Sequence, residues 1–264
     1  MLHIKANRMK IYCGIDSGSL STDCVLWDGN KIISYSIMPT LTSAEKAANI
    51  ALESCLSKTN YKINDIAKIV TTGYGRYNIS NSDKAVTEIT CHARGARKLF
   101  DEVMTIIDIG GQDSKIIKLT PEGRVDDFVM NDKCAAGTGR FLEVMAIALG
   151  TDIENMGELS LKSKNDISIS STCTVFAESE IIGLISRGIV KSDIAYGLHK
   201  SVAERIFAMT SRLKCKPPYI MTGGVAKNIG VVRAVSEKLE YDVIVPNEPQ
   251  IVGALGAVLI STEI

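Results

Sequence analysis

Residues 11–34 alternate apolar and polar stretches in a way that predicts three short β-strands joined by tight turns. An apolar run from Ile11 ends at Asp16, a Ser-Gly-Ser turn follows, and a second apolar run leads to the turn Trp27-Asp-Gly-Asn. This pattern is typical of a β-hairpin. Residues 105–128 repeat it, with Asp108 before a Gly-Gly turn. The two aspartates lie 92 residues apart, which indicates an internal duplication and two similar α/β domains.

The glycine turns after these aspartates suit a phosphate group. Gly18, Gly110 and Gly111 allow backbone N–H groups to approach phosphate oxygens, because no Cβ stands in the way. Ser19 and Thr22 can add hydroxyl donors. A single turn of this kind is also an ordinary strand connection, but its repetition at the same place in a second hairpin favours phosphate binding.

The carboxylates suggest the chemistry of nucleotide hydrolysis. Asp16 and Asp108 can orient Mg²⁺ or its water ligands beside the phosphates of a nucleoside triphosphate held between the domains. Gln112 follows the second glycine turn and can orient an attacking water through its neutral amide. We therefore expect Asp16, Asp108 and Gln112 to be the catalytic residues, with positioning and electrostatics supplying most of the catalysis.

A third pattern occurs near residue 219, where an apolar strand stops at Gly223-Gly224 and an amphipathic helix follows. Bare backbone at such a turn suits close passage of an adenosine ribose and base. Taken alone, the pattern also fits a helix N-terminus after a flexible turn.

Composition limits the possible functions. The 264 residues are 45% hydrophobic, enough for a substantial core, and Lys+Arg equals Asp+Glu at 30 each, so no basic field favours nucleic acid or a membrane surface. The apolar stretch from Ile251 to Ile260 is shorter than the ~20 residues that a membrane span needs. The N-terminus lacks a secretory signal and Met9 is a possible alternative start, so we expect a cytoplasmic protein.

The seven cysteines are scattered and form no Cys-x-x-Cys, so most are expected to be small core residues. Cys134 and Cys173 stand out, because each comes shortly before an apolar pattern of helical spacing. Asn131 and Asp132 are expected to cap the first helix, and Ser171 and Thr172 the second. A helix N-terminus favours a thiolate, which binds metals readily.

Two thiolates per chain cannot complete the four-thiolate shell of a [4Fe–4S] cluster, but a two-fold axis would double them. Cys134 and Cys173 of a homodimer could therefore hold one cluster. Two other interpretations stay open at this point: both cysteines are inert helix-start residues, or Cys134 and the following Gly-Thr-Gly belong to the nucleotide site.

The three nucleotide patterns together resemble the actin, sugar kinase and heat-shock ATPase superfamily. More specifically, the segments NDKCAAGTGRFLE, SSTCTVFAESE, TEITCHARGA, IDIGGQDSK and MTGGVAKN resemble the ATPase activators of 2-hydroxyacyl-CoA dehydratases and the ATPase subunits of benzoyl-CoA reductase. These motifs are long and extend over nearly the whole chain.

This resemblance implies two ribonuclease-H-like domains around ATP, the first made of residues 1–103 and 248–264 and the second of residues 104–247. It implies that Cys134 and Cys173 bridge a [4Fe–4S] cluster in a homodimer, reduced by a ferredoxin or flavodoxin. ATP hydrolysis would then drive one electron into an iron–sulfur dehydratase or reductase, in an anaerobic host. The position after Thr22, often lysine in relatives, is Asp23 here, which predicts slow or differently supported ATP turnover.

The main alternative is a small-sugar kinase of the same fold, although residues 40–90 show no clear sugar pocket or catalytic aspartate. A nucleotide-gated scaffold or chaperone fragment is a second alternative. It would have no use for Cys134.

Overall fold

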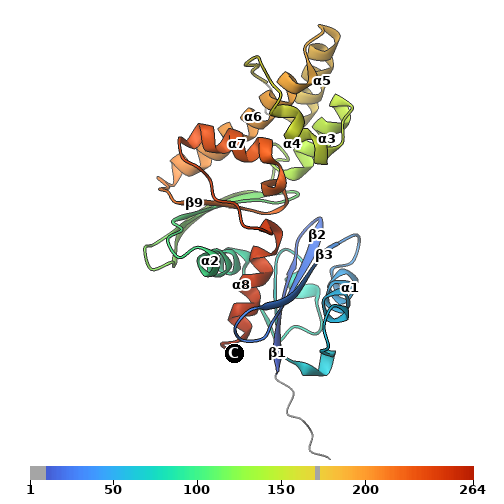
Figure 1. Cartoon of the computed structure of the whole chain (residues 1–264), viewed down its shortest axis with the longest axis vertical. Coiled ribbons are helices and arrows are strands. Elements are labelled where there is room, and N and C mark those ends of the chain that lie inside the picture. Colours follow the sequence, from blue (N-terminus) through green and yellow to red (C-terminus); the bar gives the residue numbers. More distant parts are fainter. Residues whose placement is uncertain (1–9, 170–172) are drawn as a thin grey trace, which may run out of the picture. The chain divides into compact units, whose positions relative to one another are not determined.

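The computed structural model describes residues 10–169 and 173–264, which divide into two compact units. Unit 1 comprises Met1–Gly95 and Ile251–Ile264, and unit 2 comprises Ala96–Gln250 (Figure 1). The expected domain boundaries, 103/104 and 247/248, fall close to these divisions but not at them.

Unit 1 is a five-stranded sheet with helices against it. The strand order is β3-β2-β1-β4-β5, with β1–β3 antiparallel and β4 and β5 parallel to β1. The elements are β1 (Ile11–Ser17), β2 (Ser21–Trp27), β3 (Ile32–Pro39), α1 (Ala44–Ser57), β4 (Ile66–Thr72), β5 (Lys84–Ala85), α2 (Glu88–Leu99, whose last four residues belong to unit 2) and α8 (Val252–Ser261).

The helices of unit 1 follow from their sequence patterns. Ser43 caps α1, since its side chain accepts a hydrogen bond from the Lys46 backbone N–H. Ala48, Ala51 and Cys55 recur at helical spacing and are buried against the sheet. Helix α8 packs on β1 and β4, and Gly14 of β1 allows this, because a Cβ there would lie 2.1 Å from the Ala254 carbonyl oxygen.

Unit 2 repeats this plan and adds helices. Its sheet order is β8-β7-β6-β9, extended by a parallel bridge between Ile220 and Ile244. The elements are β6 (Thr105–Ile109), β7 (Ser114–Leu119), β8 (Val125–Asn131), α3 (Gly139–Leu149), α4 (Ile153–Ser160), α5 (Thr174–Ser186), α6 (Lys191–Arg212), β9 (Tyr219–Thr222) and α7 (Ile229–Leu239).

Both sheets have the same connection of strands, an antiparallel three-stranded meander whose first strand pairs with a later parallel strand. This shared topology explains the duplicated sequence pattern and confirms the α/β fold class of two ribonuclease-H-like units. The core of unit 2 joins the sheet to the helices, through residues such as Ile107, Phe141 and Leu198. Within the described ranges, the helices include none that is long and apolar enough to span a membrane.

Candidate functional site

The first glycine turn lies between β1 and β2 in unit 1. The Gly18 N–H donates to the Ser21 carbonyl at 2.9 Å, which leaves Ser19 and Leu20 as the two residues of the turn. Thr22 is fully buried, and its hydroxyl lies 2.9 Å from that of Thr40. The structure therefore places Gly18 and Ser19 at the turn, while Thr22 supports it from beneath.

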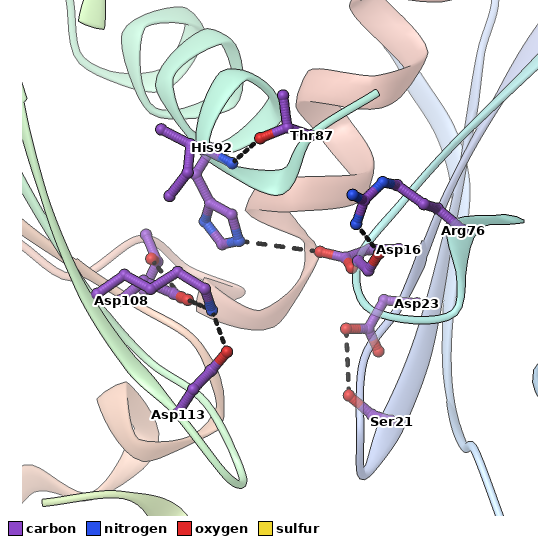
Figure 2. Close-up of polar contacts among 12 residues, drawn as sticks. Asp16, Ser21, Asp23, Arg76, Thr87, His92, Asp108 and Asp113 are labelled. Carbon is purple, nitrogen blue, oxygen red and sulfur yellow. Dashed lines mark hydrogen bonds and ion pairs between the residues drawn. The ribbon is translucent and has the colours of Figure 1, made fainter. Parts of the chain in front are cut away.

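Asp16 is almost completely buried at the end of β1. His92 of α2 points toward it, with Nε2 lying 3.8 Å from Asp16 Oδ2 (Figure 2). Two glycines make room for the carboxylate: a Cβ on Gly253 would lie 1.9 Å from Oδ2, and one on Gly73 would lie 2.4 Å from Oδ1. Asp16 is thus enclosed by three separate segments of unit 1.

Asp23 lies directly opposite Asp16, because the two are register partners in the β1–β2 pair. Side chains of opposed residues share a face, so two buried carboxylates are neighbours in the first hairpin. The Ser21 hydroxyl donates to Asp23 Oδ2 at 3.2 Å (Figure 2). Asp23 therefore adds a second carboxylate on the same face as Asp16.

The second hairpin, in unit 2, has the same turn geometry and a different charge. The Gly110 N–H donates to the Asp113 carbonyl at 3.0 Å. Lys115 occupies the place opposite Asp108, and its buried Nζ lies 3.2 Å from Asp108 Oδ2 and 2.8 Å from Asp113 Oδ2. Thr222 donates to Asp108 Oδ1 at 2.8 Å. Both oxygens of Asp108 are engaged within unit 2.

The strand β9 brings the third predicted turn to this hairpin. Gly223 follows β9 and has a φ of +84°, and a Cβ there would lie 2.4 Å from the Ile109 carbonyl and 3.0 Å from Asp108 Oδ1. Gly224 and Gln112 are exposed. Asp108 and the predicted glycines of unit 2 thus lie together where the paired strands β6 and β9 end.

The structure separates the cysteines into two groups. Cys13, Cys24, Cys55 and Cys91 are fully buried core residues, and burial raises the pKa of the Cys91 thiol to about 12. Thiols of this kind stay protonated and inert. Cys173 is exposed, and Cys134 and Cys215 are half-buried. Burial also raises the pKa of Cys215.

The expectation that Asn131 and Asp132 cap the first cysteine helix is wrong. Helix α3 begins at Gly139 after Thr138, so Cys134 lies in the preceding loop of residues 132–138. Asn131 is the last residue of β8, and its amide donates to the carbonyls of Cys134 and Ala136 at 2.9 and 3.2 Å. The polar residues that look like a helix cap instead brace the loop.

Cys173 occupies the N-cap position of α5, which agrees with a cysteine at a helix start. Ser171 and Thr172, which are expected to cap this helix, lie outside the described residues. Val175 and Phe176, in the first turn of α5, expose 67% and 66% of their surface, and α5 lies at the end of unit 2 remote from its sheet (Figure 1). Two exposed apolar side chains therefore follow the exposed thiol in the chain.

Sequence reasoning missed two neighbours of the predicted catalytic aspartates. His92 faces Asp16 from a helix 76 residues farther along the chain, and no local pattern in the sequence indicates this contact. Lys115 had a recognisable signal, since it lies seven residues after Asp108, as Asp23 does after Asp16.

Comparisons with known proteins identify relatives of this chain. The chain is 48% identical to the activator of lactoyl-CoA dehydratase from Anaerotignum propionicum, over 95% of this chain and 96% of that protein. The solved structure of the 2-hydroxyisocaproyl-CoA dehydratase activator from Clostridium difficile, with bound ADPNP, has a TM-score of 0.92 and 44% identity, covering 96% and 94% of the two chains.

Component A of the (R)-2-hydroxyglutaryl-CoA dehydratase from Acidaminococcus fermentans gives a TM-score of 0.93 at 41% identity, covering 96% of this chain and 98% of that one. These likenesses confirm the expected resemblance to dehydratase activators. A family model matches residues 13–261, nearly all of the sequence. The chain therefore belongs to the BadF/BadG/BcrA/BcrD ATPase family.

Proposed function

We propose that this protein uses ATP to deliver single electrons to an iron–sulfur partner, either a 2-hydroxyacyl-CoA dehydratase or a related reductase. The observation that carries the proposal is the exposed Cys173 at the start of α5, in an ATPase-family chain whose relatives are dehydratase activators. The four fully buried cysteines have no access to a ligand, which leaves Cys134, Cys173 and Cys215. Burial raises the pKa of the Cys215 thiol and so disfavours its thiolate, which makes Cys134 and Cys173 the best candidates.

In this proposal ATP is held by the turns of both hairpins. Gly18 and Ser19 serve the phosphates from unit 1, and Gly110 and Gly111 serve them from unit 2. The adenosine lies against the backbone of Gly223 and Gly224, where no Cβ stands in the way.

The catalytic aspartates have different surroundings, and we assign them different tasks. Asp108 is held by Lys115 and Thr222, so it fixes the second hairpin. Asp16 is assigned to Mg²⁺ or its waters, because its carboxylate lies opposite that of Asp23 and two neighbouring carboxylates favour a cation. Gln112 is exposed at its turn, where its amide can orient the attacking water.

The residues present fit a [4Fe–4S] cluster shared by two chains. When bound, such a cluster supplies one-electron chemistry at low potential. Among the described residues, no group of three or more His, Cys, Asp or Glu side chains could hold a metal ion. One chain therefore offers less than a full ligand set. Cys134 and Cys173 from each of two subunits complete it, and the N-terminus of α5 favours the negative charge.

The homodimer is supported by the exposed apolar residues beside Cys173. Val175 and Phe176 would be covered by the second subunit, which removes two large side chains from water. A ferredoxin or flavodoxin is the proposed electron donor. The small-sugar kinase remains the alternative, and it would require neither thiolates nor a dimer.

Purification without oxygen, followed by iron and sulfide analysis, tests the electron-transfer proposal. We expect about four irons per dimer, lost in both Cys134→Ser and Cys173→Ser. Cys215→Ser is the matched control, because Cys215 is also half-buried in unit 2 and should leave the iron content unchanged. Iron-free wild-type protein that phosphorylates a sugar would establish the kinase instead.

The nucleotide proposal is tested separately by ATP hydrolysis. We expect Asp16→Asn to abolish Mg²⁺-dependent turnover while cluster content is retained. Unchanged turnover in this variant would show that Asp16 does not serve the metal.

A further inference from the structure

The start of α3 is hydrogen-bonded to the second glycine turn. The backbone N–H of Gly139 donates to the Gly110 carbonyl at 2.9 Å, and that of Arg140 donates to the Gly111 carbonyl at 2.8 Å. All four residues belong to unit 2. The first two N–H groups of a helix have no partner inside it, so here the turn satisfies them.

These two bonds determine where the turn directs its own donors. In a trans peptide the C=O and the following N–H point in opposite directions. Because the Gly110 and Gly111 carbonyls face α3, the N–H groups of Gly111 and Gln112 point away from it. Helix α3 therefore orients the N–H groups that are predicted to bind phosphate.

A side chain at the helix start would fit tightly against the turn. A Cβ on Gly139 would lie 3.2 Å from the Gly110 oxygen, 3.3 Å from Gly111 Cα and 3.4 Å from a methyl group of Val225. The Gly-Thr-Gly sequence thus has a packing role beside the nucleotide turns of unit 2.

The same segment leads back to Cys134 through a braced loop. The Asn131 amide donates to the carbonyls of Cys134 and Ala136, and Arg205 of α6 donates to Asn131 Oδ1 at 3.3 Å. Thr138, next to Gly139, donates through its N–H to the Ala135 carbonyl at 3.0 Å. Each bond limits independent movement of the loop between β8 and α3.

We propose that Gly139 and Asn131 are positioning residues that couple the second phosphate turn to Cys134. A phosphate that accepts hydrogen bonds from the Gly111 and Gln112 N–H groups rotates the two peptide planes to which these groups belong. The Gly110 and Gly111 carbonyls are part of the same planes and are bonded to α3, so the rotation moves α3 and the loop before it. The coupling works in both directions, so the state of the loop changes nucleotide affinity by the same factor. This inference rests on the proposed function and adds the route within unit 2.

Gly139→Pro tests the route with Gly139→Ala as its matched control. Proline is well tolerated at the first position of a helix, and the extended backbone of Thr138 suits a residue before proline. Both variants add a Cβ, but only proline removes the N–H that donates to Gly110 and puts its Cδ in the place of that hydrogen. A difference between the two variants therefore reports interruption of the contact between α3 and the turn rather than the added Cβ.

Two measurements on the full-length, cluster-free chain are needed. The first is ADP affinity, which we expect to fall about fivefold in Gly139→Pro relative to Gly139→Ala, the effect of one ordinary hydrogen bond. The second is the rate of alkylation of Cys134 by iodoacetamide with and without ADP, read by peptide mass spectrometry. We expect ADP to change this rate about fivefold in wild type and Gly139→Ala, and not in Gly139→Pro. Cys215 is the internal reference.

Asn131→Asp provides a second test if Gly139→Pro does not fold. The aspartate keeps the acceptor for Arg205 but loses both donors to the loop carbonyls, so the response of Cys134 to ADP should disappear. Equal ADP affinity and equal Cys134 response in the proline and alanine variants would overturn the coupling. Wild-type protein that binds ADP without any change at Cys134 would also overturn it and leave the ATPase proposal standing, whereas absence of nucleotide binding would sink the proposed function itself.

Discussion

His199 predicts a specific loss of stability in acid. It is fully buried on α6, where its Nδ1 lies 3.0 Å from Ser160 Oγ at the end of α4. The Ser160 hydroxyl already donates to the Gly157 carbonyl at 2.6 Å, so it accepts from Nδ1–H. Nε2 then accepts from the amide of Asn228, the N-cap of α7, at 3.4 Å. This neutral imidazole joins three helices, and a second ring proton would face another donor.

The size of the effect follows from the shift in the pKa of His199. Burial lowers this pKa from 6.5 to about 3. A lowered pKa means that the stabilisation is complete above pH 6.5 and is lost as the pH falls toward 3, at about 1.4 kcal/mol for each pH unit. Between pH 7.0 and pH 5.0 we therefore expect His199 alone to lower the free energy of unfolding by about 2 kcal/mol.

Urea denaturation of wild type and His199→Gln at the two pH values measures this loss. Far-UV circular dichroism follows the helices, and the one tryptophan of the chain, Trp27, reports unit 1 as an internal control. The wild type should lose about 2 kcal/mol more than the variant, while the Trp27 transition responds equally in both proteins. Equal losses by circular dichroism would refute a buried neutral His199.

Two further outcomes are expected. Gly253→Ala places a methyl group 1.9 Å from Asp16 Oδ2, so Mg²⁺-dependent ATP hydrolysis should fall. The control is Gly183→Ala, whose added Cβ meets no described atom within 4 Å and whose rate should stay well above that of Gly253→Ala. Equal rates in the two variants would contradict the tight packing around Asp16. Hydrogen bonds from Asn165 and the neighbouring backbone lower the pKa of Asp193 to about 2. The stabilisation by the Asp193 carboxylate is therefore present above pH 3.8 and lost toward pH 2. The thermal unfolding temperature of Asp193→Asn should depend less on pH in this range than that of the wild type, and an unchanged dependence would contradict the lowered pKa of Asp193.

The hairpins and their aspartates could be predicted because the signal is local. An apolar strand, a carboxylate and a glycine turn are consecutive in the sequence, and the second copy of this pattern supports the interpretation of the first. The partners of Asp16 could not be found in this way, since His92 and Gly253 reach it only when distant helices pack on the sheet. Burial of that kind depends on tertiary contacts that no short pattern contains.

The first cysteine segment shows a different limit. Asn131 and Asp132 have the composition of a helix cap, but the same residue types also end strands and brace loops. Here Gly137 adopts a φ of +82°, and the chain turns once more before α3 begins at Gly139. The local pattern was compatible with both arrangements, and the backbone bonds to the second turn decide between them.

The return of α8 to unit 1 has a consequence for biosynthesis. Unit 2 is encoded between the two parts of unit 1, so the ribosome completes it before residues 252–261 are translated. Until then the face of β1 and β4 that α8 covers stays open to water. All five strands of the first sheet are therefore synthesised while one apolar face of that sheet still lacks its helix, which makes this stage a natural point of chaperone engagement.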